Sequence, residues 1–445
     1  MSIGNSSVWI RTGGGVAAVA LFACLLAAQG PALSAGDAGH GEADAPAACS
    51  PICPGKLSIP ATVPESCAAR EPQPLARVGF RQWGGHVVVP VSINGSRALN
   101  MVLDTGMSAP IVLLGSMSLA EETGLKDGQP TMIGGAGGQE PVAGSLFSGI
   151  RVSVGDAELS EQTVITLPGS GSPSPCIRDG VIGKSIFDRY LVEIDFEAAV
   201  LSIHEGAVSD TNGFVSLPLD LSVGVPKLAA EIEMDDGRKT PVVLDLDLGA
   251  RHALSLFFNE AKGIAAPAQN LATVVGRGMQ GEIRGQIGRV RALHLGALAL
   301  RDVVTSFTDI ENFSSCAVGG RGMDGNLGIE VLNRFRVILD YPGSRLLLKP
   351  NSMFERPFEY NMAGLSLEPQ DDGSYLVRAV TIGSPGEEAG IARGDRIVGI
   401  DGEELTRGSY DERAERFQQD GATLIVRLAR EGRRFDRTLK LRRLI

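Results

Sequence analysis

A long stretch of this chain occurs twice, and this internal repeat constrains the fold more than any other feature. Each copy opens with a hairpin signal, continues with an apolar strand that ends on one acid, and closes with a glycine-containing apolar segment. The matching landmarks lie 142 to 145 residues apart: Asn94-Gly95 and Asp236-Gly237, Asp104 and Asp247, Gly183 and Gly328. Two copies of one β-rich unit in tandem explain this nearly constant spacing.

The first copy carries its acid at the end of an apolar strand. Met101-Val102-Leu103 precedes Asp104, and Thr105, Gly106 and further small residues follow. A buried carboxylate costs several kcal/mol unless it is hydrogen-bonded, paired or protonated. Thr105 can hydrogen-bond a neighbouring turn, and Gly106 allows a second backbone to approach closely. Asp104 is therefore a candidate for chemistry, with a purely structural charge as the alternative.

Asp104-Thr105-Gly106 resembles the active-site turn of aspartic proteases of the retroviral and pepsin-like kind, and the resemblance extends over about residues 80–352. It implies a mainly β fold with two retropepsin-like (pepsin-type acid protease) lobes in tandem. The catalytic residues would be Asp104 and Asp247, which would share a proton over a cleft because neighbouring carboxylates do not both ionise easily. Such a dyad hydrolyses peptides without a cofactor. The active-site turns would contain Thr105, Gly106, Leu248 and Gly249.

The second copy departs from this family pattern at Leu248, which stands where Thr105 has a hydroxyl. Leucine cannot make a hydrogen bond between the lobes, so either the brace is one-sided or lobe 2 has lost catalysis and keeps only the fold. Asp245 is an alternative second acid, but it lacks the following glycine, and we favour Asp247. His252 is expected to be a solvated loop histidine, with tuning of Asp247 as the alternative.

The order of elements is also expected to repeat. A short helix at Met117–Thr123 would recur at Phe257–Ala261. Val181-Ile182-Gly183 would recur as Asn326-Leu327-Gly328, and both resemble the hydrophobic-hydrophobic-Gly segments that cross beneath the catalytic turn in aspartic proteases. Asn326 departs from that pattern at its first position.

Two glycine-rich loops, Ile133–Gln139 and Val275–Gly281, follow the two acid-bearing turns. The resemblance makes them substrate flaps, more like retroviral flaps than a pepsin flap because neither contains tyrosine. Mobile hairpin tips without a role are the alternative. The predicted flap residues are Ile133, Gly134, Gly135, Val275 and Gly276.

The last part of the chain is different. Ser384–Gly402 closely resembles the PDZ domains of bacterial exported proteases. The resemblance implies a groove that binds a peptide or a protein C-terminus by adding a strand to the sheet edge. Its binding residues would be Gly364, Leu365, Ser366 and Leu367. The alternative is that this groove only packs on the protease lobes.

Composition and motifs exclude several other function classes. The formal net charge of −11 argues against a nucleic-acid partner, because phosphate binding needs a basic face. The five histidines form no His-Glu-x-x-His motif, and the chain contains no Gly-x-Ser-x-Gly motif.

The N-terminal segment predicts export. Arg11 precedes the apolar run Val16–Ala28, which is too short to span a bilayer comfortably, and small residues extend to Ala35. We expect a signal peptide, a periplasmic or secreted protein and no membrane span after cleavage; an uncleaved anchor or lipidation at Cys24 are alternatives. The predicted parts are a signal peptide at 1–35, a linker or arm at 36–76, lobe 1 at 77–210, lobe 2 at 211–354 and a PDZ domain at 355–445.

Signal cleavage would leave an odd number of cysteines: Cys49, Cys53, Cys67, Cys176 and Cys316. The first three, with His40, match no familiar zinc spacing. We expect a disulfide tether, with unpaired thiols as the alternative.

The sequence therefore predicts an exported aspartic-type endopeptidase that acts on polypeptide substrates. The alternatives are a catalytically degenerate peptide-binding scaffold or chaperone, or a homodimeric protease that uses only the Asp104 turn of each copy.

Overall fold

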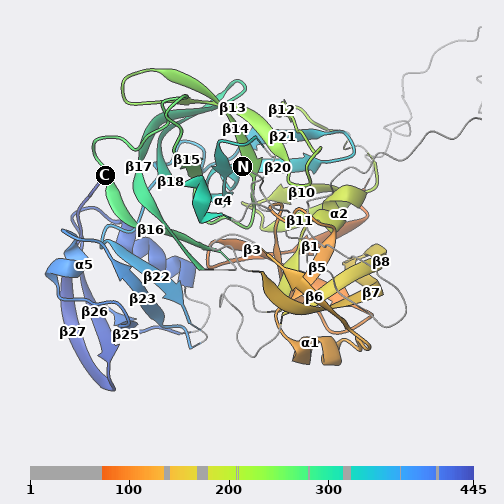
Figure 1. Cartoon of the computed structure of the whole chain (residues 1–445), viewed down its shortest axis with the longest axis horizontal. Coiled ribbons are helices and arrows are strands. Elements are labelled where there is room, and N and C mark those ends of the chain that lie inside the picture. The colour runs from red at the N-terminus through yellow and green to blue at the C-terminus, as the bar shows by residue number, and fades with distance from the viewer. Residues whose placement is uncertain are drawn as a thin grey trace, which may run out of the picture. The chain divides into compact units, whose positions relative to one another are not determined.

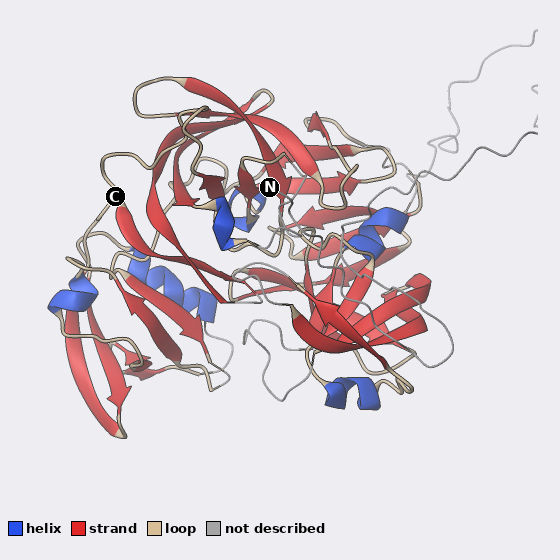
Figure 2. Cartoon of the chain, in the orientation of Figure 1, coloured by secondary structure: helices blue, strands red, loops and turns tan. Residues whose placement is uncertain are grey.

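Strands dominate the structure, and its helices are few and short (Figure 1; Figure 2). The computed structural model describes residues 73–134, 141–167, 179–206, 208, 210–278, 281–313, 322–370, 372–406 and 410–445. The predicted signal peptide, most of the arm, all six cysteines, His40 and the predicted flap residue Gly135 lie outside the described residues.

Lobe 1 is built on one sheet of eight described strands in the order β2-β3-β4-β9-β5-β8-β7-β6. A further pairing between β3 and β7 curls this sheet on itself. Two short helices, α1 (Met117–Glu122) and α2 (Lys184–Arg189), belong to the same lobe. The strands are β2 (Arg81–Trp83), β3 (His86–Ile93), β4 (Leu99–Leu103), β5 (Ile111–Leu114), β6 (Gln129–Ile133), β7 (Val142–Val154), β8 (Ala157–Thr166) and β9 (Gly180–Ile182).

Lobe 2 repeats this topology with seven described strands in the order β13-β14-β19-β15-β18-β17-β16, and β13 also pairs with β17. In both lobes the acid-bearing strand lies parallel to the glycine-containing strand, β4 to β9 and β14 to β19. The predicted duplication is confirmed. The elements are β13 (Lys227–Glu233), β14 (Lys239–Leu246), β15 (Leu254–Phe257), β16 (Leu271–Gly278), β17 (Gly281–Leu295), β18 (Leu298–Thr308), β19 (Gly325–Leu327), η1 (Ile310–Asn312) and α4 (Ile329–Leu332).

The predicted helix at Phe257–Ala261 is wrong. Phe257 is the last residue of β15, and a short turn follows it. The backbones of Asn259 and Ile264 exchange hydrogen bonds that close this turn, and the Asn259 side chain accepts from the amide of Lys262. The matching helix of lobe 1 has an N-cap, because the Ser116 hydroxyl accepts from the amide of Leu119.

A third sheet joins the two lobes, which the sequence did not predict. Its six described strands run in the order β1-β11-β10-β20-β21-β12, and β10 of the first half pairs antiparallel with β20 of the second. The sheet crosses the predicted boundary at residue 210. Its strands are β1 (Ala76–Gly79), β10 (Leu191–Asp195), β11 (Val200–His204), β12 (Val215–Pro218), β20 (Phe335–Asp340) and β21 (Arg345–Pro350).

The C-terminal module has its own sheet and its own hydrophobic core around Tyr375 and Phe417. Ser384 caps the helix α5 through the amide of Glu387, as its Ser-Pro motif predicts. Its elements are β22 (Leu365–Pro369), β23 (Tyr375–Val380), α5 (Pro385–Glu388), β24 (Arg396–Ile400), β25 (Glu403–Glu404), α6 (Tyr410–Ala414), η2 (Glu415–Gln418), β26 (Thr423–Arg430) and β27 (Arg433–Lys440).

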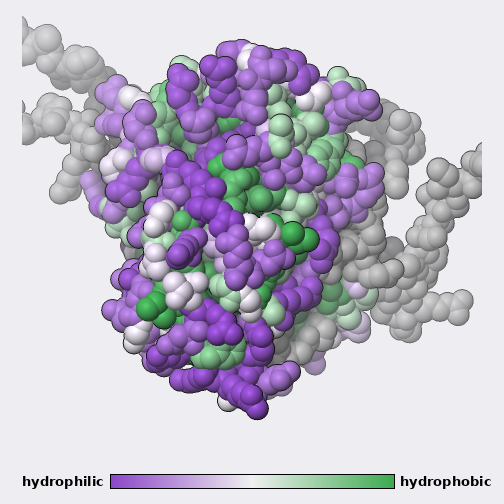
Figure 3. Space-filling model, turned by 90° about the vertical axis from the view of Figure 1, so that its left-hand side faces the viewer, coloured by the Kyte–Doolittle hydropathy of each residue, from purple (hydrophilic) through white to green (hydrophobic). Residues whose placement is uncertain are grey.

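One face of the molecule is mainly hydrophilic, with hydrophobic residues in small groups between the polar ones (Figure 3). Such scattered hydrophobic residues are normal for a protein surface. Among the described residues, no helix is long and apolar enough to cross a membrane.

Candidate active site

The two lobes deliver Asp104 and Asp247 in the same way. Each residue directly follows its acid-bearing strand. The amide of Asp104 donates to the carbonyl of Ile182 at 2.9 Å, and the amide of Asp247 donates to that of Leu327 at 3.0 Å. The parallel strands β9 and β19 thus fix the backbone of both acids at equivalent places.

The structure brings the two predicted catalytic residues together, each carboxylate against the glycine of the other turn. A Cβ atom on Gly106 would lie 2.8 Å from Asp247 Cγ, and one on Gly249 would lie 2.5 Å from Asp104 Cγ. Both distances are so short that any side chain at these positions would displace the opposite carboxylate. Asp245 is not part of this arrangement, because it lies within β14 opposite Lys227.

Each carboxylate is also held by its own turn. The amide of Gly106 donates to Asp104 Oδ1 at 2.7 Å, and that of Gly249 donates to Asp247 Oδ1 at 2.8 Å. Asp104 also lies close to the Gly249 amide and to the carboxyl group of Asp247, and both influence its pKa. Two carboxyl groups at this proximity form a hydrogen bond with each other only when one of them carries a proton.

Burial raises the pKa of Asp104 well above its usual value, and the nearby charge of Asp247 raises it further. Hydrogen bonds from Gly106 and Gly249 oppose this shift. The arrangement therefore favours one proton shared by the carboxyl groups of Asp104 and Asp247, with Asp104 as the residue that holds it.

The brace between the lobes is one-sided. The buried hydroxyl of Thr105 donates to the carbonyl of Leu246 at 2.7 Å and accepts from the amide of Leu248 at 2.9 Å. Leu248 is fully buried in the hydrophobic core and offers no hydroxyl in return. Thr105 therefore joins two backbone groups of lobe 2 by itself.

We expect Thr105→Val to lower the free energy of unfolding by about 2–6 kcal/mol, because it removes the hydroxyl partner of two buried backbone groups at about 1–3 kcal/mol each. Chemical denaturation measures the change. Thr123→Val is the matched control, since the buried Thr123 hydroxyl bonds only carbonyls of its own helix. It should cost about 1 kcal/mol. Equal losses in the two variants would contradict a brace between the lobes.

Lobe 2 adds a polar pair that the family pattern does not contain. Asn326 Nδ2 donates to Asp247 Oδ2 at 2.8 Å, and His252 Nε2 lies 3.1 Å from Asn326 Oδ1. The prediction of a solvated loop histidine is wrong, because burial lowers the pKa of His252 and its ring bonds to Asn326. The departure of Asn326 from the hydrophobic pattern was the signal for this pair.

Another contact between the lobes involves His86 of β3, which the sequence did not single out. His86 Nε2 bonds to the carbonyl of Gly249 at 3.0 Å. Since a carbonyl only accepts, Nε2 carries a hydrogen and is the donor. Burial, together with the charge of Arg251, lowers the pKa of His86 to about 4. His86 thus supports the Asp247 turn from lobe 1.

The predicted flap residues lie on paired hairpin strands. Ile133 ends β6 and is followed by Gly134, and β6 pairs with β7. Val275 and Gly276 lie in β16, at an irregularity in its pairing with β17. Their role in covering substrate stays a prediction.

The predicted peptide-binding residues of the C-terminal module lie at a sheet edge. Gly364 has a positive φ of 67°, and Leu365 begins β22. Among the described strands, β22 pairs with β23 alone. Its other edge offers backbone groups to which an extended peptide can add.

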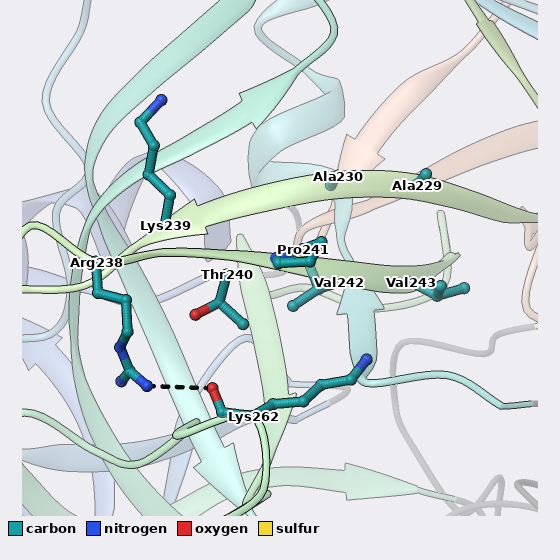
Figure 4. Close-up of a pocket in the computed structure, with 9 residues that line it drawn as sticks. All are labelled: Ala229, Ala230, Arg238, Lys239, Thr240, Pro241, Val242, Val243 and Lys262. Carbon is teal, nitrogen blue, oxygen red and sulfur yellow. Dashed lines mark hydrogen bonds between the residues drawn. The ribbon is translucent and has the colours of Figure 1, made fainter.

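A separate hollow of about 410 Å³ lies on β13 and β14 (Figure 4), but none of the predicted site residues lines it. Its basic side chains already have partners. Arg238 donates to the carbonyls of Lys262 and Gly263, and Lys262 Nζ donates to Asp324 at 2.6 Å. This hollow is not the candidate site.

Two family models agree with this assignment of the two modules. Residues 89–186 match the family model of an aspartyl protease, and residues 376–430 match that of a PDZ domain. The crystal structure of the aspartic proteinase from Irpex lacteus matches with a TM-score of 0.38 and 12% identity, over 63% of this chain and 98% of that one. No curated protein matches the sequence. The chain contains an aspartyl protease domain and a C-terminal PDZ domain.

Proposed function

We propose that this protein is an exported aspartic-type endopeptidase whose dyad is Asp104 and Asp247. The observation that carries this proposal is the reciprocal packing of the two carboxylates, each against the glycine of the opposite turn. The aspartyl protease match covers only the first of the two turns. The second turn is assigned from the repeated topology.

The proposed mechanism uses the shared proton. The ionised carboxylate takes a proton from a water molecule as the water attacks the peptide carbonyl, while the protonated carboxyl polarises that carbonyl. The raised pKa of Asp104 supports this residue as the proton holder. Asp247 then acts as the base. The proton balance is restored when the tetrahedral intermediate breaks down and the leaving amine is protonated.

The PDZ domain would recruit substrates or partner proteins. Among the described strands β22 pairs with β23 alone, which leaves its other edge without a strand partner for an extended peptide to add to. The proposed residues for binding a peptide or a C-terminus are Gly364, Leu365, Ser366 and Leu367. The proposed substrates are therefore polypeptides whose cleavage site reaches the dyad while another segment, or a C-terminus, binds the PDZ domain.

Export and the domain bounds are further parts of this proposal. Export rests on the residues from Arg11 to Ala35. The proposed bounds are 1–35, 36–76, 77–210, 211–354 and 355–445, although the sheet that joins the lobes crosses the bound at residue 210.

Cleavage of an unstructured peptide library from acid to neutral pH tests the proposed function. We expect internal cleavage with a bell-shaped pH profile, because one carboxyl must be ionised and the other protonated. The rate should be proportional to protein concentration, since one chain supplies both acids. Peptide binding without cleavage at any pH would favour a scaffold. A rate that rises with the square of the protein concentration would favour a homodimer.

A further inference from the structure

The two acids of the proposed dyad have different surroundings. Asp247 Oδ2 accepts a hydrogen bond from Asn326, and Asn326 in turn bonds to His252. The equivalent positions of lobe 1, by the spacing of the repeat, are Val181 and Ala109. Val181 is buried and apolar, so lobe 1 has no corresponding side-chain donor at this place.

The directions of the hydrogen bonds that link His252, Asn326 and Asp247 follow from the donors and acceptors of their side chains. Asn326 donates through Nδ2 to Asp247, so its Oδ1 is free to accept. His252 Nε2 must therefore be the donor in the 3.1 Å contact with Asn326. Burial lowers the pKa of His252, which favours a neutral ring with its hydrogen on Nε2. All three groups then have one consistent orientation.

We infer that Asn326 and His252 are a pair of positioning residues that hold Asp247 as the ionised, water-activating carboxylate and leave the shared proton on Asp104. The inference rests on the proposed function. The Nδ2 group of Asn326 can donate a hydrogen bond to a carboxylate but cannot accept one from a carboxyl, so it favours the ionised form of Asp247. His252 fixes which way the amide points.

The other titratable and charged groups around Asp247 do not supply this preference. Asp104, in the turn after β4, raises the cost of a second charge. Tyr341, directly after β20, is buried with its pKa raised, so it is neutral. Arg251 comes four residues after Asp247, and its charge lowers the pKa of His252 and of His86. The preference for an ionised Asp247 therefore comes from Asn326, which donates a side-chain hydrogen bond directly to Asp247 Oδ2.

Asn326→Val, which places the lobe 1 residue type in lobe 2, tests the inference. A hydrogen bond that stabilises a charged carboxylate lowers its pKa, so its loss should move the acid limb of the kcat/KM profile upward by about one pH unit. At pH values below the acid limb, kcat/KM of Asn326→Val should therefore be about tenfold lower than that of the unmodified protein. His252→Leu should shift the limb in the same direction by less. His252→Gln should restore it, because a glutamine amide can donate to Asn326 Oδ1.

Asn351→Val is the matched control. Asn351 is also half-buried. Its Nδ2 donates to the carbonyl of Asn333 at 2.8 Å, and its Oδ1 accepts from the backbone amide of Met353 at 2.9 Å. This variant should lose stability without moving the acid limb. An unchanged limb in Asn326→Val, or equal shifts in His252→Gln and His252→Leu, would overturn the inference.

A second measurement separates this inference from the proposed function. NMR titration of aspartates labelled with ¹³C at the side-chain carboxyl reports the protonation of the dyad whether or not the protein cleaves peptides, with Asp104→Asn and Asp247→Asn for assignment. We expect the lower of the two apparent pKa values to rise in Asn326→Val. If the unmodified protein cleaves nothing, the proposed function fails while this rise still supports the positioning role. An unchanged titration overturns the role even in an active enzyme.

Discussion

Asp104→Asn and Asp247→Asn are each expected to lower kcat/KM for peptide cleavage by about a thousandfold, the scale of one positioned proton-transfer group. An amide can neither take the proton from the attacking water nor return it. The two residues depend on one shared proton, so the double variant should be little worse than either single one. Single-turnover and steady-state assays on a peptide that the unmodified protein cleaves measure the effect.

The pH dependence of stability provides the control for folding. The pKa of Asp104 is raised in the folded state, so its contribution to stability is present at low pH and is lost as pH rises through that value. Asp104→Asn has no such proton to lose. The melting temperature of Asp104→Asn minus that of the unmodified protein should therefore increase as the pH rises. Inactivity together with this gain would identify a folded variant that lacks its acid.

The pattern of inactivation also distinguishes the alternatives. Loss in both single variants supports a dyad within one chain. Loss only in Asp104→Asn, with activity that rises as the protein dimerises, would contradict it and support a homodimer of the first turn. An active Asp104→Asn variant would exclude aspartic catalysis at this site.

The sequence predicted the features that depend on local pattern and on repetition. Asn94 and Gly95 both have positive φ, as the hairpin signal requires. Asp104 and Asp247 occupy equivalent places because each follows a strand fixed by the same parallel pairing. The constant spacing over two copies predicts this equivalence without any knowledge of the contacts between the lobes.

The features that the sequence did not predict depend on contacts between segments that are distant in the chain. The pairing of β10 with β20 and the bond from His86 to Gly249 join different lobes, and neither has a local sequence signal. The wrong helix at Phe257–Ala261 came from extending the repeat too far, into a segment that a tight turn closes. Leu248 was recognised as a departure. The sequence did not show that Thr105 alone would bond both backbone groups of lobe 2.

Gly249→Ala is expected to lower kcat/KM by about a hundredfold or more while the protein stays folded. The added Cβ would lie 2.5 Å from Asp104 Cγ and 2.6 Å from Oδ1, whereas carbon atoms normally pack at about 3.5–4.0 Å. The carboxylate must therefore move by about 1 Å, and a displacement of this size at a reacting group costs about 10²-fold in rate. The expected loss of stability is smaller, about 1–3 kcal/mol, as for other overpacked sites.

Gly106→Ala should act in the same way on Asp247, with a slightly smaller effect because its Cβ would lie 2.8 Å from Asp247 Cγ. Gly79→Ala in β1 is the matched control, since a Cβ there would meet no atom within 4 Å. Peptide cleavage and thermal unfolding are measured for all three variants. Cleavage at the unmodified rate by both turn variants would mean that the carboxylates can leave the opposite glycines without cost. The reciprocal packing would then not be what holds the dyad in its reactive geometry.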